Sequence, residues 1–298
     1  MSMPVKELLT WGEKQLAEAG VVDASRDSKT LYCYLMGIPE SRLILEYQNT
    51  LQDSICDNYF QLIDRRGAGE PIQYITGSQD FMGCNIKVDP RVLIPRLDTE
   101  VLVEDAIDLI NSGRLRGAVE GNPGDSWDVL DLCCGSGAIG IAIQKFCPKA
   151  KVTCLDISEG ALELAKENAD RNGVGRKMKF LQGNMFEPLQ GRFHPLTFDM
   201  IISNPPYIKR DVIETLQREV KDHEPRLALD GGEDGLDYYR TIASEAPKHL
   251  KRGGCLIMEI GADQKDGVRE ILGSICVYTE VKCFQDLAGL DRVVYAKL

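Results

Sequence analysis

The sequence predicts an α/β fold, with a small helical bundle ahead of a mostly parallel sheet that carries helices on both faces. Three observations support it. The first 75 or so of the 298 residues place apolar side chains at helical spacing. From residue 128 onward, short apolar runs alternate with amphipathic segments, which is typical of a parallel sheet with crossover helices. A glycine-rich turn directly follows the first of these runs and precedes a predicted helix.

Three short amphipathic helices are predicted in the N-terminal part. Each has apolar residues on one face and a glycine near its end, which is a common helix stop. We expect them to pack into a bundle, because a short amphipathic helix has to bury its apolar face against another element. The first runs from Val5 to a stop at Gly20, the second from a cap at Asp23 to Gly37, and the third from Gln52 to Gly67.

The pattern changes between Pro71 and Pro95. Extended segments are predicted at 72–75, 86–88 and 92–94, and they would form a short hairpin between two domains. A helix is predicted at 98–110, followed by a glycine-rich loop at 114–126. The expected organisation is a helical domain at 1–75, a hairpin linker at 76–97 and an α/β domain at 98–298.

The α/β domain is expected to contain seven strands. The last two are joined by a loop too short for a crossover helix, so they should pair antiparallel as a hairpin. The predicted strands span 128–132, 151–155, 178–181, 198–203, 254–260, 277–283 and 292–296. The predicted helices between them span 138–146, 158–171, 238–250 and 263–273.

The glycine-rich turn has the features of a ligand-binding loop. Glycine lets the backbone turn sharply and approach a ligand, and the start of the following helix presents free N–H groups. Asp156 ends the next strand, where a carboxylate can accept hydrogen bonds from both hydroxyls of a ribose. On these residues alone a dinucleotide site, an S-adenosylmethionine site and an ordinary capped turn all stay open. The turn comprises Cys133, Cys134, Gly135, Ser136 and Gly137.

The fourth predicted strand ends in Asn204-Pro205-Pro206-Tyr207. Ligands of open α/β sheets bind beyond the carboxyl ends of the strands, and the prolines restrict the backbone there. The Asn204 side-chain oxygen and the Pro205 carbonyl would then be two fixed acceptors for an –NH₂ group. Holding both N–H bonds of a planar amide favours its pyramidalisation as it attacks a methyl donor. Tyr207 is expected to wall this pocket, and the tetrapeptide favours methyl transfer to nitrogen over a dinucleotide enzyme.

Composition narrows the class of protein further. The net charge is −11 and both halves are acidic, which lowers the odds of a nucleic-acid substrate. Neither a signal peptide nor an apolar run of membrane-spanning length is evident, so no membrane partner and a cytoplasmic location are expected. The ten cysteines are scattered, and with the three histidines they show no zinc-ligand spacing, so free thiols and no metal site are expected.

Several further segments resemble the HemK/PrmC family, the release factor glutamine methyltransferases, and the resemblance covers nearly the whole chain. They are Gly69–Ile75, Phe81-Met82-Gly83, Leu93–Glu100, Glu224–Leu229, Met258–Gly261 and Asp286–Arg292, besides the Asn-Pro-Pro-Tyr tetrapeptide. The resemblance implies a class I methyltransferase fold, with a seven-stranded Rossmann-like sheet. It implies S-adenosyl-L-methionine as the cofactor. It also implies a bacterial release factor as the partner, which the helical domain grips and whose Gly-Gly-Gln glutamine is methylated.

The resemblance also implies a set of site residues. The cofactor would meet the turn at 133–137, Asp156, Asn184, Met185 and Asn204, and the glutamine would be held by residues 204–207. Arg96, Thr99, Glu100 and Glu224 are expected to shape the substrate cleft, although Pro95 and Thr99 also suit a strand end and a helix cap. Glu224 also suits a solvated turn, and it is not expected to be a general base.

The sequence departs from the family pattern in two places, at Cys133 and at Asn184-Met185, and other activities stay open. Cys133 stands where the family usually has glycine, and Asn184-Met185 where it usually has Asp and an aromatic, so altered cofactor affinity is expected. The tetrapeptide is shared with adenine-N6 and other amino methyltransferases, which are the alternative enzymes. A noncatalytic cofactor-binding protein is the alternative of a different class, and the intact tetrapeptide argues against it.

Overall fold

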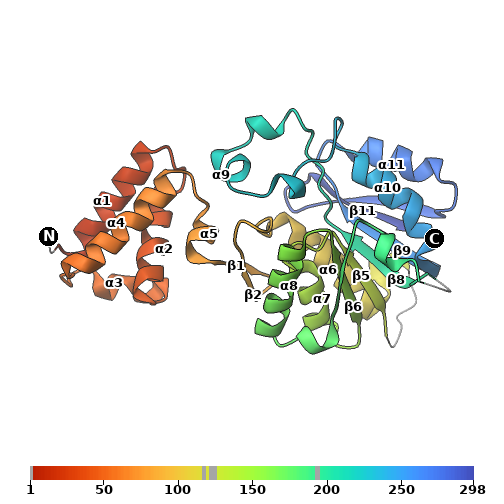
Figure 1. Ribbon diagram of the computed structural model, residues 1–298, viewed down its shortest axis with the longest axis horizontal. Helices are drawn as coiled ribbons and strands as arrows, with labels where there is room; N and C mark the ends of the chain where they lie inside the picture. Colours follow the sequence, from red (N-terminus) through yellow and green to blue (C-terminus); the bar gives the residue numbers. More distant parts are fainter. Residues whose placement is uncertain (1–2, 116–118, 121–125, 192–194) are drawn as a thin grey trace. The chain divides into compact units, whose positions relative to one another are not determined.

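The computed structural model describes residues 3–115, 119–120, 126–191 and 195–298, and it divides into two compact units (Figure 1). Unit 1 comprises residues 1–78 together with 216–223. Unit 2 comprises 79–215 and 224–298. No helix in the described ranges is both long enough and apolar enough to cross a membrane.

Unit 1 contains the three predicted helices, α1 (Val5–Glu18), α2 (Ala24–Met36) and α4 (Asp53–Gly67). Their apolar faces form one buried cluster. Gly12 is required where α1 meets α4, because a Cβ atom there would lie 2.3 Å from the Tyr59 hydroxyl. That hydroxyl lies 2.7 Å from Ser28 Oγ, which donates to the Leu9 carbonyl, so the close approach also satisfies buried polar groups. Two elements absent from the prediction lie between α2 and α4, namely a 3₁₀ turn (Glu40–Arg42) and α3 (Leu43–Glu46).

Unit 1 also has a buried ion pair. Arg66 and Asp27 are both almost fully buried, and their side chains are 2.6 Å apart. The same guanidinium donates to Glu219 at 2.7 Å, on the short helix α9 (Arg218–Lys221), and Arg218 donates to the Ala68 carbonyl. The later segment 216–223 is thereby attached to unit 1.

The prediction of an extended segment at 72–75 is wrong. Ile72–Thr76 form a short helix, α5, which starts after Pro71 and ends at Gly77 in a left-handed conformation. A short apolar run fits a helix or a strand equally well by its periodicity, so tertiary packing decided the outcome. The hairpin itself is present as β1 (Ser78–Phe81) and β2 (Cys84–Lys87), whereas 92–94 form no strand.

Unit 2 is built on the predicted seven-stranded sheet, in the order β10-β11-β9-β8-β5-β6-β7. Strand β11 is antiparallel to both β10 and β9, and the remaining pairs are parallel. The predicted hairpin is confirmed, but the insertion of β11 between β9 and β10 was not predicted. The strands are β5 (Asp128–Leu132), β6 (Lys151–Asp156), β7 (Lys179–Gln182), β8 (Phe198–Ser203), β9 (Leu250–Glu259), β10 (Glu280–Gln285) and β11 (Asp291–Lys297).

Helices cover both faces of this sheet (Figure 1). Helix α10 (Asp237–Glu245) and α11 (Lys265–Ser274) pack on the face that carries Leu130, Leu132 and Ile201. The opposite face is covered by α6 (Asp98–Ser112), α7 (Ala138–Phe146) and α8 (Glu159–Arg171). The prediction extended the helix that ends at Glu245 to residue 250, whereas a 3₁₀ turn (Ala246–Lys248) follows and β9 begins at Leu250.

The predicted glycine-rich loop at 114–126 lies partly outside the described residues. Its described parts include two short strands, β3 (Arg114–Leu115) and β4 (Val119–Glu120), which pair antiparallel. The loop prediction at 116–118 and 121–125 falls on residues that the structure does not describe.

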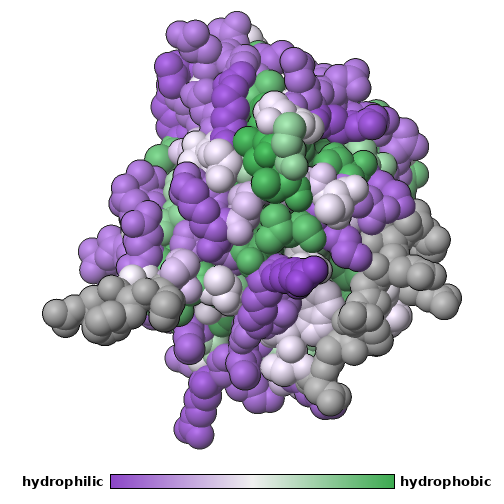
Figure 2. Space-filling model, turned by 90° about the vertical axis from the view of Figure 1, so that its right-hand side faces the viewer, coloured by the Kyte–Doolittle hydropathy of each residue, from purple (hydrophilic) through white to green (hydrophobic). Residues whose placement is uncertain are grey.

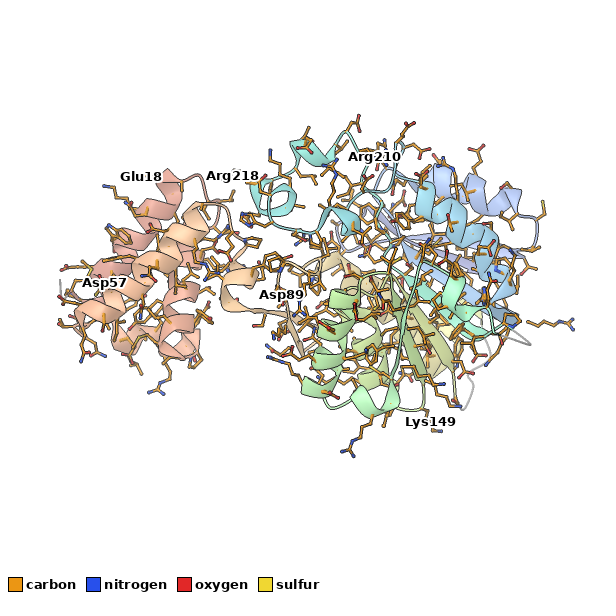
Figure 3. All side chains as sticks on the ribbon, in the orientation of Figure 1. Glu18, Asp57, Asp89, Lys149, Arg210 and Arg218 are labelled. Carbon is orange, nitrogen blue, oxygen red and sulfur yellow. The ribbon has the colours of Figure 1, made fainter. Side chains whose placement is uncertain are left out.

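The face of the molecule shown in Figure 2 is mostly hydrophilic. Figure 2 shows one face on which a band of apolar side chains lies between hydrophilic ones. Charged side chains project from both units, including Glu18 and Asp57 in unit 1 and Lys149 in unit 2 (Figure 3).

All ten cysteines lie in the described ranges and are free, and seven of them are buried, as their scattered spacing predicts.

Candidate active site

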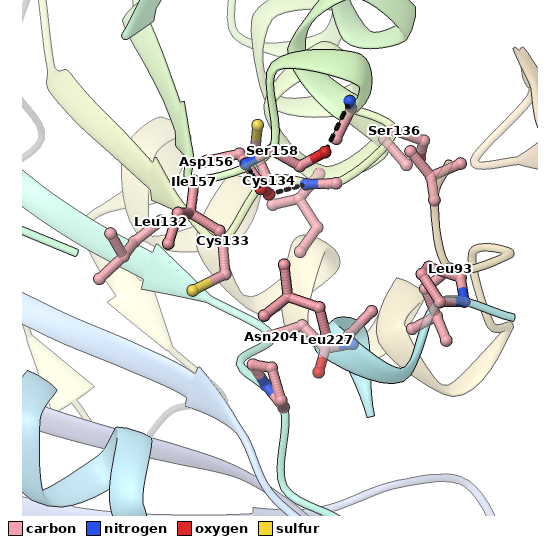
Figure 4. Close-up of a pocket in the computed structure, with 18 of the residues that line it drawn as sticks. Leu93, Leu132, Cys133, Cys134, Ser136, Asp156, Ile157, Ser158, Asn204 and Leu227 are labelled. Atoms are coloured by element: carbon pink, nitrogen blue, oxygen red, sulfur yellow. Dashed lines mark hydrogen bonds between the residues drawn. The ribbon is translucent and has the colours of Figure 1, made fainter. Parts of the chain in front are cut away.

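A cavity lies in unit 2 beyond the carboxyl ends of β5, β6 and β8 (Figure 4). It is open to solvent at its mouth, and residues from several separate segments of unit 2 line it. Eleven of the sequence-predicted site residues line it, namely Arg96, Thr99, Cys133, Cys134, Gly135, Ser136, Asp156, Asn184, Met185, Asn204 and Pro206. The other five, Glu100, Gly137, Pro205, Tyr207 and Glu224, are not in the lining.

The glycine-rich turn forms one wall of the cavity. Gly135 has a φ of +52°, and a Cβ built on it has no atom within 4 Å among the described residues, so a side chain there would occupy the cavity. Gly137 has a φ of +78° and precedes α7, and its Cβ would lie 3.0 Å from Ala165 Cβ on α8. Gly135 therefore keeps the cavity open, whereas Gly137 permits the packing of two helices.

Asp156 is fixed beside this turn by backbone donors. Its Oδ2 accepts from Gly135 N at 2.8 Å and its Oδ1 from Ser158 N at 2.9 Å (Figure 4). Burial raises the pKa of this carboxyl, and the backbone hydrogen bonds oppose the rise. The carboxylate is thus preorganised at the cavity wall, and its remaining lone pairs can accept hydrogen bonds from a ligand.

Asn184 and Met185 line the cavity after β7. Met185 has a φ of +48°, and its sulfur lies 3.9 Å from Cys133 Sγ. Burial raises the pKa of the Cys133 thiol, so it stays protonated and acts as a small apolar surface. The two sulfur-bearing side chains, which stand where the family pattern has other residues, therefore contact one another.

The tetrapeptide places Asn204 at the cavity, following β8. The Asn204 Nδ2 group donates to Thr99 Oγ1 at 3.1 Å, so the side-chain oxygen is the atom available to a donor in the cavity. Pro206 also lines the cavity, and Pro205 lies between them in the chain. The end of β8 is tied to β5 by a 2.7 Å hydrogen bond from Ser203 Oγ to the Leu132 carbonyl.

Tyr207 does not wall the cavity, contrary to the sequence-based expectation. Its hydroxyl donates to Glu259 Oε1 at 3.2 Å, and burial raises its pKa. Its carbonyl accepts from Gln264 Nε2 at 2.9 Å. Tyr207 therefore anchors the tetrapeptide to the end of β9.

Of the residues predicted to shape the substrate cleft, Arg96 and Thr99 line the cavity, whereas Glu224 and Glu100 support it from outside the lining. Glu224 is buried, its carboxylate lies 2.5 Å from Arg96 Nη2, and it accepts from Ile94 N. Glu100 accepts from Met82 N at 2.7 Å, in the β1–β2 turn where Met82 has a φ of +51°. Both carboxylates hold backbone segments beside the cavity.

Cys133→Gly is expected to stabilise the protein. Cys133 has a φ of +60°, a conformation that costs a residue with a Cβ atom about 1 kcal/mol and costs glycine nothing. The gain is reduced by the entropy of an added glycine, so we expect the free energy of unfolding to rise by about 0.5 kcal/mol. Chemical denaturation measures it, with Cys147→Gly as control. Cys147 has a φ of −121°, so that change should only destabilise.

A buried carboxyl lies beneath the turn and should make stability depend on pH. Asp131 is fully buried, its Oδ2 accepts from Gly140 N, and burial raises its pKa to about 7. Folded protein therefore binds more protons than unfolded chain between about pH 4 and pH 7, and stability falls as the pH rises through that window. Between about pH 5 and pH 8 the fall is about 2 to 3 kcal/mol. Asp131→Asn should remove that part of the slope in denaturation curves, and an unchanged slope would contradict the assignment.

Sequence reasoning missed Glu259 and the apolar part of the lining. Glu259 lies in one of the segments that carry the family resemblance, but residue type alone gave it no role. Its position, one residue beyond the register partner of Ser203, was the signal that could have found it. The apolar lining comes from distant segments, and residue type alone gave its side chains no role, even where they lie in segments that carry the resemblance; examples are Phe81, Val92, Leu93, Leu227 and Tyr238.

Comparisons with known proteins identify the family of the chain. Residues 7–77 match the family model "PrmC N-terminal domain", and residues 118–233 match "Methyltransferase small domain". A release factor glutamine methyltransferase of Geobacter sulfurreducens is 40% identical over 99% of this chain and 96% of its own. One of Moorella thermoacetica is 37% identical over 99% of this chain and 98% of its own. A crystal structure of a methyltransferase from Pyrococcus furiosus has a TM-score of 0.50 and 19% identity over 72% of this chain and 89% of its own, which shows the fold alone.

The strand order, the antiparallel β11 and the cavity at the carboxyl strand ends define a class I methyltransferase. Full-length relatives at well over 30% identity then settle the family within that class. The chain belongs to the release factor glutamine methyltransferases.

Proposed function

We propose that this chain transfers a methyl group from S-adenosyl-L-methionine to the side-chain nitrogen of the Gly-Gly-Gln glutamine in bacterial class 1 release factors. The orientation of Asn204 carries the proposal, because its bond to Thr99 leaves the amide oxygen for a donor in the cavity. The relatives described above carry the name release factor glutamine methyltransferase, which supports the same substrate for this chain.

The cavity residues fit S-adenosylmethionine. The missing side chain of Gly135 leaves space at the wall, Asp156 supplies a carboxylate for ribose hydroxyls, and Asn184 supplies an amide for the adenine edge. Met185 and Cys133 would cover apolar parts of the ligand. When bound, this cofactor supplies an electrophilic methyl group on a sulfonium.

The chain's own contribution is to position the amide. A glutamine nitrogen is a weak nucleophile because its lone pair is delocalised into the carbonyl. The Asn204 oxygen would accept one of its N–H bonds at the cavity wall. The Pro205 carbonyl, between the lining residues Asn204 and Pro206 in the chain, is proposed to accept the other, so that the amide is oriented and its pyramidalisation favoured toward the transition state. The methylated nitrogen then becomes acidic and loses its proton to solvent.

Unit 1 is proposed to grip the release factor, so residues 1–75 form the recognition domain and 98–298 the catalytic domain. No direct contact with nucleic acid is proposed, since the chain is acidic overall. Translation factors act in the cytoplasm, which is the proposed location.

Asp156→Ala is expected to weaken cofactor binding. The variant loses a charged acceptor and also frees Gly135 N and Ser158 N, which shape the turn. Cofactor binding should become less favourable by about 1.5 to 3 kcal/mol, the usual range for a hydrogen bond to a charged group. Isothermal titration with S-adenosylmethionine measures it. Asp156→Asn keeps the shape of the side chain, so its Kd for the cofactor should lie between those of the unchanged protein and the alanine variant. An unchanged Kd for the alanine variant would contradict the role of Asp156 in cofactor binding.

Competition between substrates tests the proposed reaction. Labelled cofactor is supplied with an unmethylated release factor, the same factor with alanine for the Gly-Gly-Gln glutamine, and adenine-containing DNA. Label should enter only the unmodified factor. Label in DNA but not in the factor would establish the adenine alternative. Cofactor binding without transfer to either protein or DNA would favour a noncatalytic protein.

A further inference from the structure

Gln264 is a buried residue for which the reaction outlined above has no role. It lies between the end of β9 and the start of α11, and only 6% of it is exposed. Its side-chain amide has two N–H bonds and an oxygen, and burying such a group is costly unless partners satisfy it. The partners of Gln264 therefore indicate which parts of the structure it holds together.

The Gln264 amide has partners on several segments of unit 2. Its Nε2 donates to the Tyr207 carbonyl at 2.9 Å and to the Gly235 carbonyl at 3.1 Å. Its Oε1 accepts from Gly261 N at 2.9 Å and from the Tyr239 hydroxyl at 3.4 Å. A carbonyl can only accept and a backbone N–H can only donate, so the orientation of this amide is determined. A carboxylate at position 264 could not make the same set of bonds.

One of these bonds secures the end of the Asn-Pro-Pro-Tyr tetrapeptide. Pro205 and Pro206 have no backbone N–H, so neither can be held by donating a hydrogen bond. At the strand end, Ser203 is the last residue of β8, and its Oγ donates to a carbonyl of β5 at 2.7 Å. At the other end, Gln264 holds the Tyr207 carbonyl. The two proposed acceptors for the substrate amide lie between these ends.

Close packing holds the Tyr207 backbone as well. A Cβ atom on Gly231 would lie 2.7 Å from Tyr207 Cα. A Cβ atom on Gly235 would lie 2.5 Å from the Tyr207 carbonyl oxygen and 2.7 Å from Gln264 Nε2. The loop that contains both glycines therefore lies directly against Tyr207, and Gln264 ties the loop and the tetrapeptide together.

We propose that Gln264 is a positioning residue for methyl transfer: by holding the Tyr207 carbonyl, it fixes the tetrapeptide and the direction of its two acceptors. The inference rests on the proposed function, because a substrate amide is what requires two acceptors in fixed places. Gln264 acts through Tyr207 and is not itself a catalytic residue. A displacement of about 1 Å near a reacting centre can lower a rate about 100-fold, so a second anchor for this turn has a kinetic consequence.

Steady-state kinetics on two variants test the proposal, at a temperature where each is folded. Gln264→Met keeps a side chain of similar length but removes the amide hydrogen bonds. Gln264→Glu has at most one O–H donor, so in neither protonation state can it hold both carbonyls. Each variant should lower kcat about 10- to 100-fold, with KM and cofactor Kd within about threefold of the unchanged protein.

Gln144→Met and Gln144→Glu are the matched controls. Gln144 is also a buried glutamine of unit 2, and its Nε2 donates to the Ala150 carbonyl at 3.0 Å. Ala150 directly precedes β6, so this bond lies at the edge of the sheet opposite to the cavity. The controls should lose stability but keep their kcat.

A kcat of Gln264→Glu within twofold of the unchanged protein would overturn the proposal, as would an equal loss of kcat in Gln144→Glu. If Gln264→Glu does not fold, the methionine variants decide. A kcat of Gln264→Met within twofold of that of Gln144→Met would then overturn it.

A second readout does not depend on turnover. Ser203-Asn204 is the one Ser-Asn pair in the sequence, so protein labelled with ¹³C-carbonyl serine and ¹⁵N-asparagine gives a single signal for a ¹⁵N amide bonded to a ¹³C carbonyl. Asn204 lies three residues before the one that Gln264 holds, so this signal should shift in Gln264→Met only if the tetrapeptide moves. It should stay in place in Gln144→Met.

An unchanged Asn204 signal in Gln264→Met would refute the positioning role even if no methyl transfer were found. Absence of transfer by the unchanged protein would refute the proposed function instead, so the two failures are distinguishable.

Discussion

Asn204→Ala is expected to lower kcat by about 100- to 1000-fold at saturating cofactor, while the protein stays folded. The variant removes the side-chain acceptor for the substrate amide, and loss of one preorganised hydrogen-bonding group at a reacting centre has this effect in other enzymes. The folded state should tolerate the change, because the hydrogen bond that the Asn204 side chain gives up is the one it donates to Thr99.

The measurement is single-turnover methyl transfer to a release factor, with melting temperature and cofactor Kd determined in parallel. Asn204 also lines the cofactor cavity, so saturating cofactor separates slower chemistry from weaker binding. Turnover within tenfold of the unchanged protein would refute the proposed amide clamp.

Arg66→Ala is expected to destabilise unit 1 by about 3 to 5 kcal/mol. The substitution leaves Asp27 buried without its guanidinium partner, and an uncompensated buried charge is costly. It also removes the link to Glu219 that attaches segment 216–223. Cofactor binding should persist, because every residue lining the cavity belongs to unit 2.

The two tryptophans allow unit 1 to be followed by itself. Trp11 packs edge-on against Phe60 in unit 1, and Trp127 directly precedes β5 in unit 2. In a Trp127→Phe background, fluorescence during denaturation reports on Trp11. Arg65→Ala is the control, since Arg65 is half exposed and its pair with Glu70 should contribute no more than about 1 kcal/mol. Equal effects of the two arginine changes would contradict the assigned importance of the buried pair.

The parts of the fold that local pattern specifies were predictable from the sequence. Strands β5 and β8 and helix α7 have the predicted bounds, because β5 ends just before the glycine turn, β8 ends before the consecutive prolines of the tetrapeptide, and α7 starts directly after the glycine turn. Helix α5 was not predictable, since its short apolar run suits either kind of element. The place of β11 between β9 and β10 is a tertiary choice that a hairpin alone does not determine.

The same division applies to the site. The glycine turn, Asp156 and Asn204 could be found because strand ends of a parallel sheet meet at one edge. Tyr207 was placed wrongly because its side-chain direction depends on Glu259, which lies 52 residues further along the chain. Glu100 and Glu224 suit a cleft by residue type, but their backbone and arginine partners direct them to support it.

The central claim is that the Gly-Gly-Gln glutamine of a release factor is the methyl acceptor. Peptide mass spectrometry of an unmethylated bacterial release factor, incubated with this protein and S-adenosylmethionine, tests it most directly. The account predicts one added methyl group, located on that glutamine, and none after incubation with the Asn204→Ala variant. A methyl group on another residue, or none at all from protein that binds the cofactor, would contradict it.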